Sequence, residues 1–150
     1  MLLSKSCIYG IRSVLLLAVE DQKKFTSIKE IANKLDIPFH FLTKILQTLG
    51  HANIIESVKG PKGGVALKAP AETISIMDII TVLDGDKLFE DCVMELSSCN
   101  EDDPCILHKS WYKTKNKLEV DFQKGTLKDL AKKIKKGNGK LYEVKPDKMN

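Results

Sequence analysis

Residues 27–50 read SIKEIANKLDIPFHFLTKILQTLG, and they contain the signals of two short helices. Ser27 and Glu30 have the spacing of a capping box, which satisfies the free N–H groups at the start of a helix. Pro38 suits the first turn of a second helix, and Gly50 is a common residue at a helix end. Apolar residues recur with helical spacing in both halves, at Ile28, Ile31, Ala32 and Leu35 and then at Leu42, Ile45, Leu46 and Leu49. Two short helices joined by a turn of about three residues form a helix-turn-helix.

A β-hairpin is predicted directly after the second helix. The loop KGPKGG at residues 59–64 separates two short β-branched runs, residues 54–58 and 65–67. Such a Gly/Pro loop is typical of a hairpin, and a hairpin in this place is the wing of a winged helix-turn-helix. A helix over residues 4–20 precedes this unit, and another beginning near Ser75 follows it. The fold class is therefore mainly α with a small β-hairpin wing, and residues 1–83 form one winged helix-turn-helix domain.

The polar face of the second helix is suited to nucleic acid. In a helix-turn-helix this helix lies in the major groove, where side chains hydrogen-bond to base edges and phosphates. With the apolar residues turned inward, the candidates for DNA contact are His40, Thr43, Lys44 and Gln47. Lys59 and Lys62 in the glycine-rich loop suit phosphate or minor-groove contact. The alternative is a helical hairpin with a solvated face, but the order of cap, turn, second helix and basic hairpin favours double-stranded DNA.

Charge is unevenly distributed along the 150 residues. Residues 1–70 carry ten Lys or Arg against five Asp or Glu, residues 71–105 one against ten, and residues 106–150 thirteen against five. The net charge of +4 therefore hides two basic ends around an acidic middle. Basic ends suit a polyanionic partner, although lysines that are merely solvated on helix faces give the same pattern.

The sequence gives no sign of a membrane span or a secretion signal. The apolar run from Val14 to Val19 is too short to cross a bilayer and lacks a small-residue cleavage site. We expect a cytoplasmic protein, and in that reducing compartment clustered cysteines indicate metal or redox chemistry. The chain has no phosphate loop and no Cys-x-x-Cys motif. We therefore do not expect an enzyme or a small-molecule substrate.

Three of the four cysteines lie close together with the spacing Cys-x6-Cys-x5-Cys, at Cys92, Cys99 and Cys105. The acidic pair before Pro104 predicts a helix that begins at Pro104, which would place His108 one turn after Cys105 on the same face. Three thiolates and one imidazole suit either zinc or an iron–sulfur cluster. The alternatives are free thiols in a loop and a surface histidine. Cys7 stands alone in the first helix and is predicted to be a small buried apolar side chain.

The remaining chain divides into a loop, two helices and a tail. Residues 84–104 show no helical periodicity and form the cysteine-containing loop. A helix from residue 105 carries an apolar stripe that is too thin for a globular core but wide enough for a helix–helix seam, at Trp111, Thr114, Leu118 and Phe122. Thr126 and Asp129 predict the cap of a last helix within residues 105–135. Residues 136–150 are predicted to be a mobile tail.

Together these features resemble the IscR/NsrR-type regulators of the Rrf2 superfamily over roughly residues 1–135. The wing motif VKGPKGG at residues 58–64 and the three-cysteine loop stand in the family's order. The resemblance implies an iron–sulfur-dependent transcription regulator with a winged helix-turn-helix. It also implies a homodimer in which a long C-terminal dimerisation helix from each subunit crosses the other. Trp111, Leu118 and Phe122 would then lie in the dimer interface.

The resemblance further implies the ligands of a cluster, which would be held by Cys92, Cys99 and Cys105. His108 stands three residues after the last cysteine, where the IscR branch has the histidine that completes a 2Fe–2S site. The nitric-oxide-sensing branch uses a carboxylate near the N-terminus for a 4Fe–4S cluster, and Ile8 occupies that position here. The histidine-ligated 2Fe–2S form is therefore favoured over 4Fe–4S.

Three features depart from the family pattern. The first cysteine interval is one residue longer, Thr43 replaces an acidic residue that IscR uses in choosing sites, and Lys59 replaces an arginine. These three departures affect the expected operator sequence and cluster type more than the expected fold. The favoured hypothesis is a sequence-specific DNA-binding regulator whose DNA affinity is controlled by an iron–sulfur cluster. The alternative keeps DNA binding and replaces the cluster with zinc or a thiol–disulfide switch.

Overall fold

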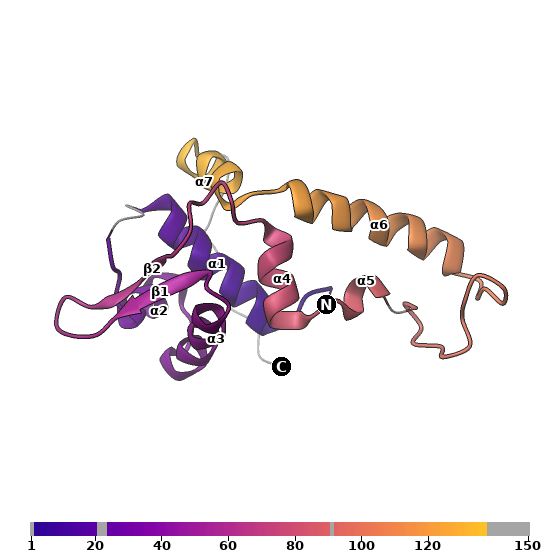
Figure 1. The fold of residues 1–150 in the computed structure, drawn as a ribbon, viewed down its shortest axis with the longest axis horizontal. Helices are drawn as coiled ribbons and strands as arrows, with labels where there is room; N and C mark the ends of the chain where they lie inside the picture. The colour runs from indigo at the N-terminus through magenta and orange to yellow at the C-terminus, as the bar shows by residue number, and fades with distance from the viewer. Residues whose placement is uncertain (1, 21–23, 91, 138–150) are drawn as a thin grey trace.

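The structure is a computed structural model that describes residues 2–20, 24–90 and 92–137. Within these ranges the chain is mainly helical with one antiparallel hairpin, which confirms the predicted fold class (Figure 1). The elements in chain order are α1 (Lys5–Val19), α2 (Ile28–Leu35), α3 (Phe39–His51), β1 (Ile55–Val58), β2 (Gly64–Leu67), α4 (Ile76–Asp84), α5 (Lys87–Glu90), α6 (His108–Lys124) and α7 (Leu127–Lys135).

The first helix of the helix-turn-helix, α2, begins where the sequence predicts. The Ser27 hydroxyl accepts a hydrogen bond from the Glu30 N–H at 3.1 Å and so caps the helix. The Glu30 carboxylate pairs with the Lys34 ammonium at 2.8 Å, so the predicted capping box is only half formed. Asp36 ends α2 with a φ of 52°, a left-handed conformation that turns the chain sharply toward α3.

The second helix, α3, starts after Pro38 and runs through His51. The prediction that Gly50 closes this helix was one residue short, because the Ala52 N–H still bonds to the Thr48 carbonyl at 3.2 Å. The predicted apolar face is the buried one, at Leu42, Ile45, Leu46 and Leu49. The opposite, polar face is thereby left toward solvent.

The wing is the hairpin β1–β2, with Ile55 opposite Leu67 and Val58 opposite Gly64. It is fixed to the segment before α2, because Thr26 and Val65 exchange two backbone hydrogen bonds of 2.9 Å. This close approach requires a glycine at position 64, where an added Cβ would lie 2.3 Å from the Thr26 carbonyl oxygen. The wing therefore has a defined position relative to the helix-turn-helix.

The core surrounds α1, which packs against α2, α3, α4 and α7. The helix α4 begins after Ser75, as predicted, and Ser75 caps it with a complete capping box to Asp78. Thr126 caps α7, which the sequence also predicts. The Leu127 N–H bonds to the Ile74 carbonyl at 2.9 Å and fixes the start of α7 to the segment that precedes α4. The core residues that are fully buried include Cys7, Val14, Leu16, Ile31, Leu35, Leu42, Leu49, Ile79, Ile80 and Leu127.

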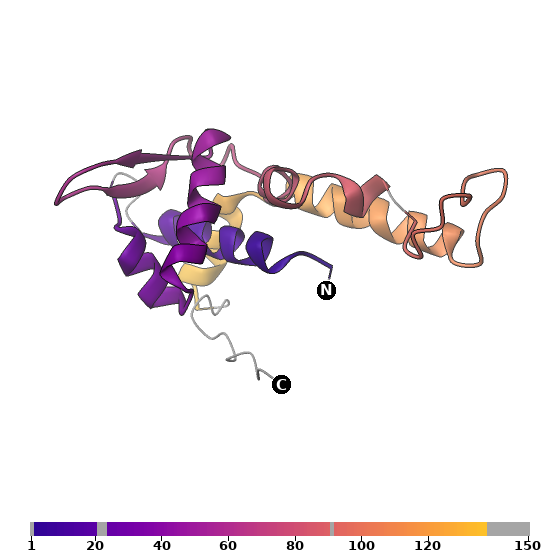
Figure 2. The same ribbon diagram turned by 90° about the horizontal axis from the view of Figure 1, so that it is seen from below.

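Beyond this core, α6 extends away from the rest of the molecule, with α5 beside it and a loop at its far end (Figure 2). The prediction that a helix begins at Pro104 was wrong, because α6 begins only at His108. The N–H groups of Asp102 and Asp103 bond to the Asn100 side chain at 2.9 and 2.8 Å, and the Cys105 N–H is directed to Cys99 Sγ at 3.4 Å, so this segment forms a turn in place of a capped helix start. Cys105 therefore lies in the loop.

Two further points concern the remaining segments. The short helix α5 lies inside residues 84–104, where the sequence shows no periodicity. Of the predicted tail, residues 138–150 lie outside the described part of the chain. None of the described helices has both the length and the apolar character needed to cross a membrane.

Candidate nucleic-acid interface and metal centre

The outer face of α3 presents the side chains that were predicted to contact DNA. His40, Lys44 and Gln47 are exposed, and Thr43 is half-buried. The Thr43 hydroxyl donates to the Phe39 carbonyl at 2.8 Å, which leaves its oxygen able to accept from a ligand. Helix α3 therefore offers both donors and acceptors along one face.

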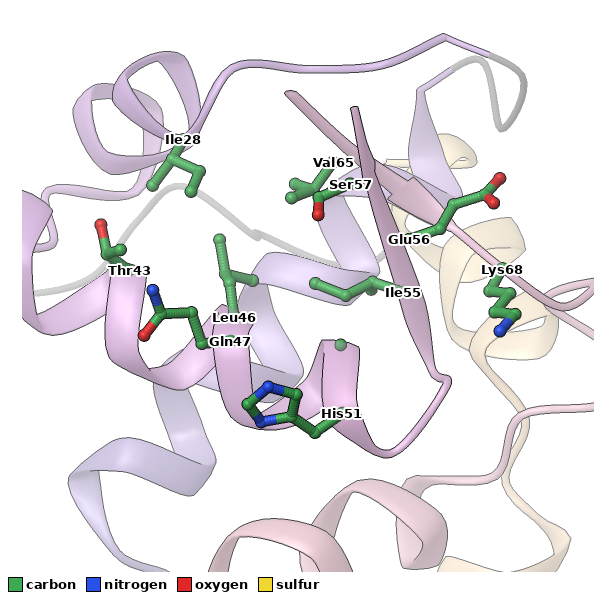
Figure 3. A pocket seen from close by; sticks show the side chains of 11 residues that line it. Ile28, Thr43, Leu46, Gln47, His51, Ile55, Glu56, Ser57, Val65 and Lys68 are labelled. Atoms are coloured by element: carbon green, nitrogen blue, oxygen red, sulfur yellow. The ribbon is translucent and has the colours of Figure 1, made fainter. Parts of the chain in front are cut away.

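A cavity of about 430 Å³ lies between α3 and the wing (Figure 3). Thr43, Gln47 and His51 line its helix side, and Ser57 lines its strand side. His51 is not among the residues that the sequence predicts to contact DNA. It lies two helical turns after Thr43 on the same face of α3, and this spacing could have identified it as part of the surface.

The wing carries its two predicted lysines near its tip. Lys59 and Lys62 are exposed, and the turn between the strands is closed by a bond of 2.9 Å from the Gly63 N–H to the Gly60 carbonyl. The hairpin projects from the helix-turn-helix in Figure 1. Two ammonium groups at the tip of such a projection are suited to the phosphates of a nucleic acid.

The four predicted metal ligands come together where the loop meets α6. The Sγ atoms of Cys92, Cys99 and Cys105 all lie within 4.8 Å of one another. The donors form two close pairs: Cys92 Sγ is 3.7 Å from Cys105 Sγ, and Cys99 Sγ is 3.2 Å from His108 Nδ1. His108 reaches this position from the first turn of α6, whereas the cysteines come from the preceding loop.

The thiols at this site do not have equal acidities. Backbone hydrogen bonds, first from Met94 and then from Leu96, hold the pKa of Cys92 below its ordinary value. The backbone N–H of Cys105 lowers the pKa of Cys99, but desolvation and the thiols of Cys105 and Cys92 outweigh it, so that this pKa is raised. Thiolates this close repel one another, and a bound cation relieves that repulsion.

The donor set fits a metal centre. Three soft thiolates and one imidazole are ligands for zinc and for iron–sulfur clusters. Two pairs of donors match a two-iron cluster, in which each iron takes two protein ligands. A cavity of about 240 Å³ adjoins the donors and is also lined by Trp111, Tyr112 and Lys115.

The residues predicted for a dimer interface have neighbours within the chain. Trp111 lines the cavity beside the thiols, Leu118 is half-buried, and Phe122 meets Phe89 edge to face with ring centroids 6.3 Å apart. Their contact with a partner stays a prediction. Apolar side chains remain exposed on α6 and its loop, at Val93, Met94, Leu96, Ile106, Leu107, Tyr112 and Val120.

The fourth cysteine lies apart from this site. Cys7 is fully buried in α1, as predicted for a small apolar side chain. Burial, followed by the charge of Asp84 and a hydrogen bond to it, raises the pKa of Cys7 to about 12. A thiol that stays protonated is a poor metal ligand and a poor nucleophile.

Comparison with known proteins agrees with this arrangement. The Rrf2 family model, described as an iron-dependent transcriptional regulator, matches residues 3–133. A protein of Aquifex aeolicus named as an HTH-type transcriptional regulator is 33% identical over 132 residues, which is 87% of this chain and 91% of that protein.

Two solved structures share the fold. CymR (YrzC), the global cysteine regulator of B. subtilis, superposes with a TM-score of 0.73 at 26% identity, covering 87% of this chain and 95% of that one. The IscR of T. potens superposes with a TM-score of 0.72 at 25% identity, covering 92% of this chain and 91% of that one.

Proposed function

Because the chain belongs to the Rrf2 family of iron-dependent transcriptional regulators, we propose that it is a homodimer that binds a specific DNA operator under the control of an iron–sulfur cluster. The observation that carries the proposal is the convergence of three thiols and the His108 imidazole at the start of α6. A non-enzymatic role in the cytoplasm follows from this function, because a DNA operator is the ligand and a reducing compartment keeps the thiols available.

The DNA is bound by α3 and the wing. The exposed face of α3 enters the major groove, where Gln47 and Lys44 reach base edges, and His40 and Thr43 add hydrogen bonds to bases or phosphates. Lys59 and Lys62 contact phosphates from the wing and fix the register of the protein on the duplex. Thr43 is uncharged, whereas some relatives have an acidic residue at this position. This chain therefore prefers a different operator sequence from those relatives.

The homodimer forms through α6. The apolar side chains that remain exposed on α6 and its loop form the surface that a second copy covers, with Trp111, Leu118 and Phe122 along the seam. A two-fold symmetric pair presents two copies of α3 to two half-sites on one side of the duplex. The spacing of these half-sites depends on how the two α6 helices cross.

The cluster is held by Cys92, Cys99, Cys105 and His108, and the 2Fe–2S form is favoured because the donors form two pairs. When bound, such a cluster supplies a one-electron redox couple and sensitivity to oxidants. The chain's own contribution is to hold the loop against α6 through these four side chains. Since α6 also forms the dimer seam, the order of the loop affects the spacing of the two α3 helices.

A second function replaces the cluster with zinc or a thiol–disulfide switch. The observation that favours it is the distance of 3.7 Å between Cys92 Sγ and Cys105 Sγ, which puts the two sulfur atoms in van der Waals contact, so that a further approach to the bond length of about 2.05 Å is needed to join them. The likeness to CymR, a cysteine regulator, supports the same alternative. DNA binding by α3 and the wing is common to both functions.

Anaerobic purification and metal analysis separate the two. The proposal predicts iron and acid-labile sulfide at about two each per chain, with visible charge-transfer absorption that is lost in Cys92→Ala and Cys105→Ala. Cys7→Ala is the matched control and retains the full absorption, because Cys7 is buried in α1. One zinc per chain without colour would establish the alternative function instead.

DNA binding is tested by retention of genomic fragments at rising salt concentration. We expect tight binding at low salt that weakens steeply as salt is added, because phosphate contacts release counterions. Lys59→Ala and Lys62→Ala lower that slope, whereas Lys135→Ala on α7 leaves it unchanged. Negligible retention at low salt, with and without metal, would refute the proposed function.

A further inference from the structure

Phe39, the first residue of α3, is a large apolar side chain that the core does not use. It is 45% exposed, and it belongs neither to the buried core nor to the half-buried apolar residues around that core. Single exposed apolar residues are ordinary on protein surfaces. Within residues 2–20 and 24–90, however, three of the four large ones lie on α3 and the wing, the elements proposed to bind DNA. The four are Leu2, Phe39, Phe41 and Val58.

Phe41, two residues further along α3, provides a contrast. Its ring meets the Tyr9 ring of α1 edge to face, with centroids 5.8 Å apart, so Phe41 contributes to the packing of α3 on α1. Among the rings that the structure describes, Phe39 contacts that of its neighbour His40, with centroids 5.4 Å apart and an interplanar angle of 74°. This contact restricts the orientation of the Phe39 ring without burying it, which lowers the entropy cost of holding the ring against a ligand.

The position of Phe39 directs its ring toward a bound duplex. In a helix-turn-helix, the N-terminal residues of the second helix contact base edges in the major groove. Side chains on a helix lean toward its N-terminus, which in α3 is the end at Phe39. Thr43 lies one turn after Phe39 on the same side of α3, and its hydroxyl donates to the Phe39 carbonyl at 2.8 Å. Phe39 therefore extends the proposed DNA-contacting surface by one turn.

An apolar ring in the major groove can discriminate among the four bases. Thymine presents its C5 methyl group there, whereas guanine, adenine and cytosine present hydrogen-bond donors or acceptors. A ring placed against those polar groups removes them from water without a hydrogen bond, which costs free energy. Against the thymine methyl group the same ring buries apolar surface on both partners. The Phe39 ring is therefore suited to thymine and unsuited to the other three bases.

We propose that Phe39 is a specificity-determining residue that reads the 5-methyl group of one thymine in each half-site of the operator. The inference rests on the proposed function in taking α3 to bind DNA in the major groove. It is independent of which metal the thiol site holds, because Phe39 lies on α3 and the thiols lie in the loop before α6. The two-fold symmetry of a dimer places the two thymines at symmetry-related positions.

The test removes single methyl groups from the DNA. Duplexes are first selected from a random-sequence library with the unmodified full-length chain under anaerobic conditions. Each symmetric pair of thymines in the selected duplex is then replaced by deoxyuridine, which lacks the 5-methyl group and keeps the base pairing. Fluorescence anisotropy at one fixed salt concentration gives the affinities. We expect one pair whose replacement weakens binding about fourfold per half-site, since burial of a methyl group contributes about that factor.

Three variants assign this methyl effect to a side chain. Phe39→Ala should bind the thymine and deoxyuridine duplexes with affinities that differ by less than about twofold, whereas Phe39→Leu, which keeps an apolar side chain, retains most of the preference. Phe41→Ala is the matched control, because it removes an exposed ring two residues away and should keep the full methyl effect. Each variant is compared on two duplexes that differ only in methyl groups, so a general loss of affinity or stability cancels from the ratio.

The outcomes separate this inference from the proposed function. An equal methyl effect in Phe39→Ala and in the unmodified chain would overturn the inference, because another side chain then reads the methyl group. An operator in which no thymine responds to loss of its methyl group would overturn it as well, and both results leave DNA binding by α3 intact. If the methyl effect depends on Phe39 in a protein that holds zinc, the iron–sulfur function fails and the inference stands. If no duplex is retained at low salt, both fail.

Discussion

The two ends of the molecule are held together in different ways. We call residues 4–83 together with α7 the head, and α5, α6 and the loop between them the arm. In α1 of the head eight of fifteen residues are buried, whereas in α6 of the arm one of seventeen is buried, and that one is a lysine. The head therefore carries its own core, and the arm does not.

This difference indicates that the head and the arm have different roles. The head holds α3 and the wing in fixed relative positions through burial, caps and the Thr26–Val65 hydrogen bonds. The arm has exposed apolar side chains and three neighbouring thiols, whose thiolate forms repel one another when no cation is bound. Under the proposed function its order depends on metal and on a second copy of the chain, which is the property that a sensing element needs.

Truncating a core residue of the head should lower the free energy of unfolding far more than truncating an apolar residue of the arm. Leu42→Ala should lower the free energy of unfolding by about 2–5 kcal/mol, because Leu42 is fully buried and leaves a cavity. Ile106→Ala should change it by less than about 0.5 kcal/mol, since Ile106 is 93% exposed. Urea unfolding followed by far-UV circular dichroism gives both values, and equal losses would break the comparison.

A smaller effect distinguishes two kinds of DNA contact within the head. Gln47→Ala should reduce discrimination between the operator and altered operators by about 1–3 kcal/mol, because it removes hydrogen bonds to a base edge. Lys59→Ala should weaken binding to all sequences alike and reduce the salt slope by about 1, because it removes a phosphate contact. Fluorescence anisotropy on a set of single-base operator variants separates them. Uniform weakening by Gln47→Ala would place α3 outside the major groove.

The smallest effect concerns helix caps. Ser75→Ala should destabilise the head by about 1 kcal/mol, because it removes the hydroxyl that accepts from the Asp78 N–H at the start of α4 and leaves only the backbone half of the capping box. Ser110→Ala, at an exposed position in α6, serves as the control and should change stability by less than about 0.5 kcal/mol. A shift of the thermal midpoint in the control as large as in Ser75→Ala would contradict the view that the arm adds little to stability.

The head was predictable from its sequence because its signals are local. Helical spacing gave the buried face of α3, and Ser27, Ser75 and Thr126 gave the starts of three helices. The errors there were small: Glu30 pairs with Lys34 instead of completing the capping box, since a nearby lysine competes for its carboxylate.

The arm was less predictable because its geometry depends on contacts that local patterns do not encode. Asp102 and Asp103 look like a helix cap, but the chain forms a turn there, in which Asn100 binds their N–H groups and Cys99 Sγ binds the Cys105 N–H, so α6 starts later. The sequence named the four donors at the thiol site. It did not reveal the burial of Lys115 or the stacking of Tyr112 on His108, because both depend on how the loop folds back on α6.

The most direct test of the account is the affinity for an operator fragment, measured under anaerobic conditions for three samples. These are the cluster-loaded protein, the same protein after chelation of its iron, and Cys92→Ala, which retains the head. We predict that the loaded and chelated samples differ by about tenfold or more in operator affinity, and that Cys92→Ala matches the chelated sample. Equal affinities in all three samples would contradict control of the head by the arm.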